Sequence, residues 1–321
     1  MSPPPSHSGG EGNRRWVDVT ERAIYLRSLP VAGMLPTKVL HAIARSLVER
    51  TFEPGAKLLE QGKPVRHMRI LTAGRLTTKS GDRVIGQVVP PESVGFLNLL
   101  AHNDGSYDAI AVEPVHALEL SADRFYTLLE DHYPLLLTTL QYTAERLLHE
   151  MKELPQEALG LPPTTFPIAV PERRLDLVER VFFMRCVSAF ANTNLGALAV
   201  LAEHMSEARV PAGHPFFSIG DKSSFTVFIL SGIVECEAPD GRIFEYGGGT
   251  AAGGVEALAG KERWYSARAK TPVVALIGTA DALVELMEDN FEIGSDFIRM
   301  LVTGLQGMLS AKAARVAASK S

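Results

Sequence analysis

The sequence contains two copies of one unit. Residues 21–136 of the 321-residue sequence recur at a nearly constant offset of 158 positions. FEPGAKLLEQG, which ends at Gly62, falls on VPAGHPFFSIG, which ends at Gly220, and ERAIYLR and ILTAGRL fall on ERVFFMR and FILSGIV. One offset that holds through glycines, prolines and apolar positions alike indicates a duplicated unit. Whatever one copy folds into, the other copy is expected to repeat.

Each copy has the same order of patterns. Apolar residues recur at spacings of three and four in residues 36–50 and 194–208, which predicts a helix at the start of each copy. Short alternating or β-branched runs follow, separated by Pro-Gly, Ser-Gly and Asp-Gly pairs, as in a small antiparallel barrel. Amphipathic helices close each copy, with Ser121 or Thr279 as the first cap but no complete capping box. The predicted fold class is mixed α+β, with two tandem β-roll (jelly-roll) barrels, each flanked by N- and C-terminal helices.

The division of the chain follows from the repeat. A proline-rich stretch between Pro155 and Pro171 predicts a semi-rigid linker between the copies. The start, MSPPPSHSGGEGNRR, has no apolar run and is rich in Pro, Ser and Gly, which favours disorder over a signal peptide. We therefore expect a disordered segment 1–18, domain 1 over 19–153, a linker over 154–174, domain 2 over 175–314 and a tail over 315–321.

Composition favours a cytoplasmic globular protein. The hydrophobic fraction of 46% supports folded cores, and no run of about eighteen apolar residues predicts a membrane span. A net charge of -5 argues against a broad nucleic-acid footprint, so we expect neither nucleic acid nor membrane as a partner. Cys186 and Cys236 are too few for a disulfide framework and lack metal-ligand spacing, so each is expected to be a reduced thiol.

Patterns for catalysis and for metal binding are missing from the sequence. The glycine-rich stretch after Tyr246 is not a P-loop, because Gly254 and Gly260 are separated by five residues and Glu262 follows Lys261. No G-x-S-x-G turn or catalytic cysteine signature occurs. Four histidines that could be ligands are scattered without a shared spacing: His67, His102, His116 and His214. We expect no enzyme activity, no catalytic residues, no metal and no cofactor.

At this point the chain resembles the cyclic-nucleotide-binding domain family, which includes protein kinase A regulatory subunits, catabolite activator protein and cyclic-nucleotide-gated channels. The resemblance rests on F/V-x-x-G-x-x-(L/F)-(L/F)-x-x-G, ending at Gly62 and Gly220, on the glycine after the next strand, Gly74 and Gly232, and on the A-x-x-P strand. It covers nearly the whole chain, twice. It implies a regulatory or sensing role, with cyclic AMP or cyclic GMP as the candidate ligand.

The family's ligand site, a phosphate-binding cassette, implies candidate residues in copy 2. In such a site a Gly-Glu opens a short helix, an Arg some nine residues later binds the cyclic phosphate, and the Glu accepts from the ribose hydroxyl. The alignment places Gly253 and Gly254 at the helix start and Arg263 at the phosphate position. The small residues expected after the Arg are Trp264 and Tyr265, which would crowd the backbone amides that the phosphate needs.

Both copies depart from the family's pattern. The glutamate position is Gly254 in copy 2, where Glu256 lies two residues later. Copy 1 has Gly95 followed by Phe96 at the helix start, and the alignment puts Gly105, followed by Ser106, at the arginine position. A charge-assisted hydrogen bond contributes about 1.5–3 kcal/mol, so losing both groups predicts that copy 1 no longer binds cyclic nucleotides. Copy 2 is the remaining, marginal candidate for cyclic-nucleotide binding.

The residues leave alternatives open. Arg263 is either a phosphate ligand or an exposed arginine paired with its neighbours, and Glu256 is either a ribose acceptor or a carboxylate favoured by the helix dipole. Trp264 and Tyr265 form either a lid or partner surface, or pack against the closing helices. Two functions follow: a sensor in which ligand in copy 2 moves the closing helices, or a ligand-independent scaffold whose pockets are filled by side chains such as Phe96 and Trp264.

The sequence also predicts that the protein acts through protein partners. No helix-turn-helix reader, kinase, cyclase or channel segment follows copy 2, so an output would need another protein. The closing helix of copy 1 has an apolar face, which favours packing on its own barrel. In the family that the chain resembles this helix often forms dimers, and the resemblance therefore implies a homodimer through the closing helices as the alternative. That face holds Leu140, Ala144, Leu147, Leu148 and Met151.

Overall fold

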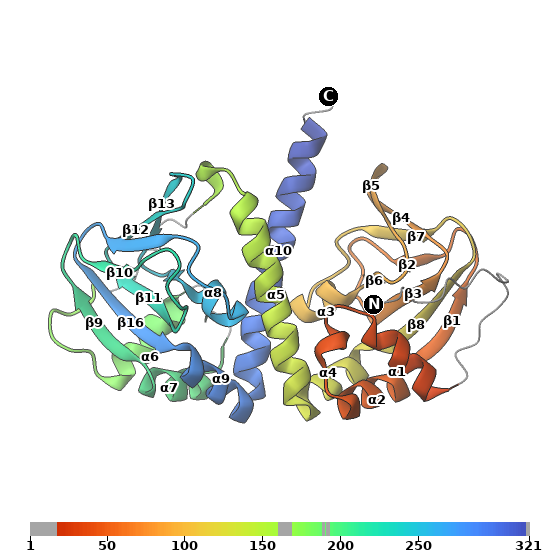
Figure 1. Cartoon of the computed structure of the whole chain (residues 1–321), viewed down its shortest axis with the longest axis horizontal. Coiled ribbons are helices and arrows are strands. Elements are labelled where there is room, and N and C mark those ends of the chain that lie inside the picture. The colour runs from red at the N-terminus through yellow and green to blue at the C-terminus, as the bar shows by residue number, and fades with distance from the viewer. Residues whose placement is uncertain (1–17, 160–168, 188–189, 191–192, 319–321) are drawn as a thin grey trace, which may run out of the picture.

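The computed structural model describes residues 18–159, 169–187, 190 and 193–318. The segment 1–17 and the central part of the linker, 160–168, lie outside these residues, and so do the predictions of disorder and stiffness made for them. Each domain has a β-roll between opening and closing helices, and the two rolls lie on either side of a central pair of helices (Figure 1).

Domain 1 follows the predicted order of helix, strands and closing helices. A short helix interrupts the strands between β6 and β7. Its elements are α1 (Val19–Arg27), η1 (Ala32–Met34), α2 (Thr37–Ser46), β1 (Val48–Phe52), β2 (Lys57–Leu59), β3 (His67–Ala73), β4 (Leu76–Ser80), β5 (Arg83–Val88), β6 (Ser93–Val94), α3 (Phe96–Ala101), β7 (Asp108–Ala111), β8 (Val115–Ser121), α4 (Ala122–Asp131) and α5 (Tyr133–Glu153).

Domain 2 repeats that order after the short η2 (Gln156–Ala158). Its last helix continues into the segment predicted as a tail, because the alanine-rich C-terminal residues are good helix formers. Its elements are α6 (Leu177–Cys186), α7 (Leu195–Glu203), β9 (Ser206–Val210), β10 (Pro215–Phe217), β11 (Phe225–Ser231), β12 (Ile233–Glu237), β13 (Ile243–Gly247), β14 (Ala251–Ala252), α8 (Gly254–Ala259), β15 (Ser266–Ala269), β16 (Val273–Thr279), α9 (Ala280–Asp289) and α10 (Phe291–Ala318).

Two four-stranded antiparallel sheets form each roll, so the mixed fold with two jelly rolls is confirmed. The strand orders are β1-β8-β3-β6 and β2-β7-β4-β5 in domain 1, and β9-β16-β11-β14 and β10-β15-β12-β13 in domain 2. The register irregularity between Leu71 and Ala73 on β3 recurs between Ile229 and Ser231 on β11. The duplication therefore extends to strand pairing and to its bulges.

Local sequence explains most of the helix boundaries. The opening helices end earlier than predicted, because Val48–Phe52 and Ser206–Val210 pair as edge strands with β8 and β16. The predicted caps are confirmed, since Ser121 Oγ and Thr279 Oγ1 accept from backbone amides three residues later. A full capping box, which the sequence analysis missed, begins α6 with Asp176.

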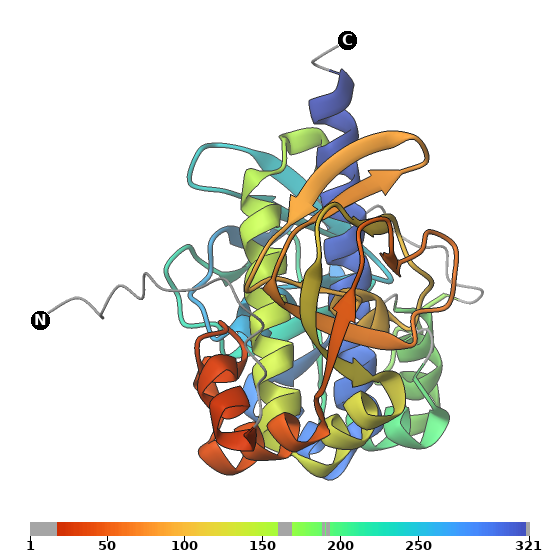
Figure 2. The same ribbon diagram turned by 90° about the vertical axis from the view of Figure 1, so that its right-hand side faces the viewer.

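The closing helices α5 and α10 pack side by side between the two rolls (Figures 1 and 2). A Cβ added at Gly294 of α10 would lie 2.7 Å from Leu136 of α5, and one at Gly304 would lie 3.7 Å from Leu147. Residues about 158 apart thus face each other, which makes the pair parallel. The glycines let the two helices approach closely.

The apolar face predicted on α5 is used within the chain. Leu140, Ala144 and Leu147 are buried in a core that joins helices of both domains, whereas Leu148 belongs to the core of the domain 2 roll. The roll of domain 1 has a smaller core of its own. This face therefore lies in a core shared by the two domains, which includes Met68, Ile70, Leu118 and Leu120 of the roll of domain 1 as well as helices of domain 2. None of the helices in the described residues is long and apolar enough to cross a membrane.

Candidate functional site

The two candidate segments, called here cassette 1 (residues 95–107) and cassette 2 (residues 253–265), have equivalent backbone positions. Gly62 N donates to Gly105 O at 2.9 Å in domain 1, and Gly220 N donates to Arg263 O at 2.9 Å in domain 2. Gly105 and Arg263 therefore occupy the same place in the two domains, as the repeat alignment predicts.

Arg263 lies in the interior of domain 2, with 2% of its surface exposed. Its Nη1 donates to Gly253 O at 2.5 Å and its Nη2 donates to Phe225 O. The guanidinium carbon lies 4.1 Å from the ring centroid of Phe217 and 5.0 Å from that of Phe225. The exposed, solvated alternative for Arg263 is therefore wrong, because the carbonyls and aromatic faces replace water around the charge.

Trp264 and Tyr265, which follow Arg263 directly and precede β15, pack in the same cluster. Tyr265 Oη accepts a hydrogen bond from Gly253 N at 2.8 Å, which occupies the amide at the start of α8. Trp264 stacks on Phe244 with ring centroids 5.7 Å apart, and Tyr265 packs edge-on to Phe244 at 5.2 Å. Both rings belong to the core of the roll, which Leu148 of the closing helix α5 also joins, so the two aromatic residues pack inside the protein and form no exposed lid.

Glu256 is also buried, with 1% of its surface exposed. Burial is the main cause of its raised pKa, which Arg263 and Lys152 oppose. Trp264 Nε1 lies near the carboxylate, but neither Nε1 nor Oε1 forms a hydrogen bond with a described residue. Glu256 therefore faces protein, not an open ligand site.

Glu256→Gln is expected to stabilise the protein at neutral and higher pH. Because the folded-state pKa is raised, the folded protein keeps this proton where the unfolded chain has released it. The wild-type stabilisation is complete below the ordinary pKa of 4.5 and is lost as the pH rises through the folded-state pKa. For one proton the slope cannot exceed about 1.4 kcal/mol per pH unit.

The measurement is urea denaturation of both proteins between pH 4 and pH 9. The variant should lack the wild-type decline above pH 4.5. Glu262→Gln, which changes an exposed glutamate of the same segment, is the matched control and should follow the wild type. A decline that persists unchanged in Glu256→Gln would show that Glu256 does not carry the buried proton.

Cassette 1 has no room for an arginine at its phosphate position. A Cβ added at Gly105 would lie 2.2 Å from Glu60 O, so any side chain there requires the loop to move. Asn98, which aligns with Glu256, is buried and donates to Asn103 Oδ1, Asp104 O and Ser106 Oγ. The Asn98 amide therefore fixes the loop that in the family carries the phosphate contacts.

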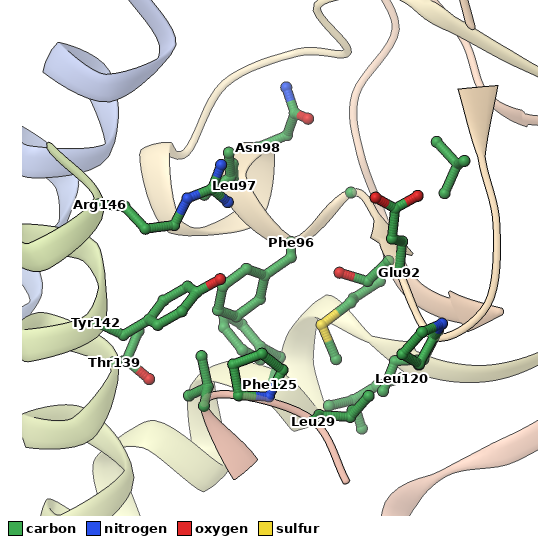
Figure 3. Close-up of a pocket in the computed structure, with 18 of the residues that line it drawn as sticks. Leu29, Glu92, Phe96, Leu97, Asn98, Leu120, Phe125, Thr139, Tyr142 and Arg146 are labelled. Atoms are coloured by element: carbon green, nitrogen blue, oxygen red, sulfur yellow. The ribbon is translucent and has the colours of Figure 1, made fainter. Parts of the chain in front are cut away.

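A cavity of about 840 Å³ lies beside cassette 1 (Figure 3). Phe96 lines it and packs edge-on against Phe125 with centroids 5.9 Å apart, so Phe96 borders the space without filling it. Gly95, Ser106 and Tyr107 line it from the cassette, and burial raises the pKa of Tyr107. Cassette 2 contributes no residue to this cavity.

Each cassette contacts the closing helix of the other domain. Asn103 Nδ2 donates to Gln306 Oε1 of α10 at 2.7 Å, and Lys261 Nζ pairs with Glu145 of α5 at 2.6 Å. Asn103 and Lys261 are equivalent positions of the two copies. The contact between cassette and opposite closing helix is therefore present in both domains.

Metal-binding and thiol chemistry find no support in the described part of the chain. There, no group of three or more His, Cys, Asp or Glu side chains is placed to hold a metal ion. Cys186 and Cys236 are free thiols, and burial raises the pKa of both. A raised pKa leaves little thiolate at neutral pH, so neither cysteine is poised as a nucleophile.

Two stretches of the chain, residues 49–132 and 207–290, match the family model described as "Cyclic nucleotide-binding domain". The chain belongs to the cyclic nucleotide-binding domain family. The two matches cover most of the two rolls, so the resemblance and the tandem arrangement inferred from the sequence are confirmed. No curated protein sequence matches the chain.

Solved structures of protein kinase A regulatory subunits are similar to the chain. The regulatory subunit of a cAMP-independent protein kinase A from Trypanosoma brucei is 15% identical over 88% of this chain and 92% of that one, with a TM-score of 0.35. The regulatory domain of protein kinase A from Toxoplasma gondii, crystallised with cAMP, is 15% identical over 94% and 99%, also with a TM-score of 0.35. The corresponding Trypanosoma cruzi subunit, bound to guanosine, is 14% identical over 86% and 88%, with a TM-score of 0.36.

The positions of the cassettes follow from the sequence, but the prediction did not include all the residues that determine their chemistry. Asn98 and Tyr107 could have been found from the offset of 158, which places them opposite Glu256 and Tyr265. The aromatic neighbours of Arg263, Phe217 and Phe225, had no comparable signal, because only the fold brings β10 and β11 to cassette 2.

Proposed function

We propose that this chain is a non-catalytic regulatory protein that acts through protein partners and does not respond to cyclic nucleotides. The observation that carries the proposal is the environment of Arg263. Its guanidinium already binds Gly253 O and Phe225 O and lies against two aromatic rings. A cyclic phosphate would have to displace these contacts before it could gain its own.

The other polar groups of cassette 2 support the same proposal. Gly253 N, the amide at the start of α8, donates to Tyr265 Oη, and the Glu256 carboxyl is buried away from solvent. Binding a ribose and a phosphate here would expose a packed aromatic core, at a cost that few new hydrogen bonds could offset. Cassette 1 lacks the arginine, and Gly105 leaves no space for one.

We further propose that the chain forms its regulatory unit from its own two domains. Because α5 and α10 bury their apolar faces against each other, domain 2 takes the place that a second copy would take in a homodimer. Output would then come from a protein partner that reads the outer surface, in keeping with the scaffold alternative. The cytoplasmic location remains a prediction.

The second candidate function, a cyclic-nucleotide sensor, is favoured by family membership alone. Isothermal titration of the full chain with cyclic AMP and cyclic GMP separates the two. We expect no saturable heat for either nucleotide up to millimolar concentration. Saturable micromolar binding of either one would overturn the proposal, whichever domain holds the ligand.

A further inference from the structure

The cavity of domain 1 is lined mainly by apolar side chains from several elements. Leu29, Met68, Leu120 and Phe125 line it from the chain after α1 and from β3, β8 and α4. Its volume, about 840 Å³, lies within the range of about 300–1,000 Å³ that is typical of small-molecule sites. The walls favour an apolar body of ligand over a ribose phosphate.

Helix α5 contributes one polar group deep in this cavity and one charged group at its edge. Thr139 and Arg146 line it at these two levels, with Tyr142 between them; Tyr142 and Arg146 reach toward Phe96 and Leu97 of α3 (Figure 3). Residues spaced by three, four and seven share one face of a helix. This one helix face therefore extends from the buried Thr139 in the apolar part of the cavity to the exposed, positively charged Arg146 at its edge.

The Thr139 hydroxyl has no hydrogen-bond partner among the described residues, although only 1% of the residue surface is exposed. Thr143, one turn later, satisfies its own hydroxyl by donating to Thr139 O at 2.7 Å. Buried hydroxyls without partners are uncommon in folded proteins, because the lost hydration is not replaced. An orphan hydroxyl on a cavity wall points to a ligand atom that can bind it.

Arg146 is the charged group without a counter-ion. It lies 6.0 Å from the ring centroid of Tyr142 and has no hydrogen bond or ion pair with a described residue. The acidic neighbours on α5 are already engaged, since Glu145 pairs with Lys261 and Glu150 pairs with Lys312. The guanidinium is therefore available to an anion at the rim.

The remaining charges on the cavity wall are one acid and one base. Glu92 accepts a hydrogen bond from Val89 N at 2.9 Å, and Arg83 lines the cavity from β5. Arg146, whose guanidinium has no ion pair with a described residue, therefore decides the charge at the rim, and it favours an anionic over a cationic ligand.

We propose that domain 1 binds an amphiphilic anion in this cavity, with its acidic group at Arg146, its apolar body against the Leu, Met and Phe side chains, and a hydrogen-bonding atom at Thr139. This site goes beyond the proposed function, which concerns cassette 2 and cyclic nucleotides. Gln306 and Ser310 of α10 line the same cavity, so a bound anion would contact the closing helices of both domains.

Two dyes that differ in one group test the proposal. The probe is 8-anilinonaphthalene-1-sulfonate, which has aromatic rings, one N–H donor and a sulfonate; N-phenyl-1-naphthylamine has the same rings and N–H without the charge. Fluorescence titration of the full chain should show saturable binding of the sulfonate with one site per chain. Laurate should displace it, and cyclic AMP should not.

Variants locate the dye. Arg146→Gln should weaken sulfonate binding about three- to tenfold, because the lost interaction is intermediate in strength between an exposed ion pair and a buried charge-assisted hydrogen bond. Binding of the neutral dye should not change. Thr139→Val, which removes the hydroxyl at nearly constant volume, should weaken both dyes about fivefold. Arg124→Gln, an exposed arginine of α4 outside this cavity, should change neither.

Other results would overturn the site. Equal weakening of both dyes in Arg146→Gln would mean that the arginine acts only on structure. Displacement of the sulfonate by micromolar cyclic AMP would assign the cavity to the family's usual ligand. Absence of saturable dye binding would remove the site but leave the proposal for cassette 2 intact, since that proposal rests on nucleotide titration.

Discussion

Arg263→Ala is expected to lower the free energy of unfolding by about 3–5 kcal/mol, the range found when one partner of a buried charged network is removed. The substitution leaves Gly253 O and Phe225 O without their donor, and it removes the cation that lies against Phe217 and Phe225. Each buried acceptor left unpaired costs about 1–3 kcal/mol. It also removes one of the two positive charges, those of Arg263 and Lys152, that oppose the raised pKa of the buried Glu256 carboxyl.

The measurement is urea denaturation followed by tryptophan fluorescence, because Trp264 lies in the affected cluster and reports on it directly. Arg268→Ala is the matched control from the adjoining strand: the Arg268 side chain is 62% exposed and pairs with Glu235 at the surface. That variant should unfold close to the wild type. Arg263→Lys should recover only part of the loss, since a single ammonium cannot reproduce the planar fork that serves two carbonyls.

This experiment also separates the two functions that the sequence left open. If Arg263 were held ready for a phosphate, its removal would abolish nucleotide binding and change stability little. A loss below about 1 kcal/mol would therefore contradict the structural role assigned here. A large loss, with no nucleotide binding in the wild type, would support a cassette that has become part of the core.

The sequence predicted the position of Arg263 but not its environment. Offset and motif both depend on residue order, and these located the cassettes and the antiparallel rolls. Burial depends on which side chains the fold brings together, and Phe217 and Phe225 lie 46 and 38 positions before Arg263 in the sequence. A charged residue next to Lys261 and Glu262 in the sequence is expected to be exposed, unless it is known that Phe217 and Phe225 surround it in the fold.

In domain 1 the sequence likewise predicted the position of the cassette but not its environment: one expectation was a filled pocket, whereas a cavity is present. One of the two functions left open by the sequence had both pockets filled by side chains, and Phe96 was the candidate in domain 1. The structure instead has Phe96 against Phe125 at the edge of a large cavity. That space depends on how α5, α10, β3 and β5 come together, and no periodicity within one element could have predicted it.

Gly232→Ala is the second substitution with a large expected effect. Gly232 has a φ of 89°, and a Cβ added there would lie 2.2 Å from Pro272 O and 3.0 Å from Val273 Cα. The glycine that follows the strand and the proline of the A-x-x-P motif therefore contact each other. Gly74 repeats it in domain 1, with a φ of 83° and a Cβ position 2.3 Å from Pro114 O.

We expect Gly232→Ala to destabilise the protein by about 2–5 kcal/mol, from about 1–2 kcal/mol of left-handed backbone strain and about 1–3 kcal/mol of overpacking. Gly213→Ala is the matched control, because Gly213 has a φ of 87° and nothing within 4 Å of its Cβ position. It should cost only the strain, about 1–2 kcal/mol. Urea denaturation of both variants gives the difference, which is the cost of the contact with Pro272. Equal losses would mean that strand β16 moves aside freely and that the two motifs recur only for their backbone conformation.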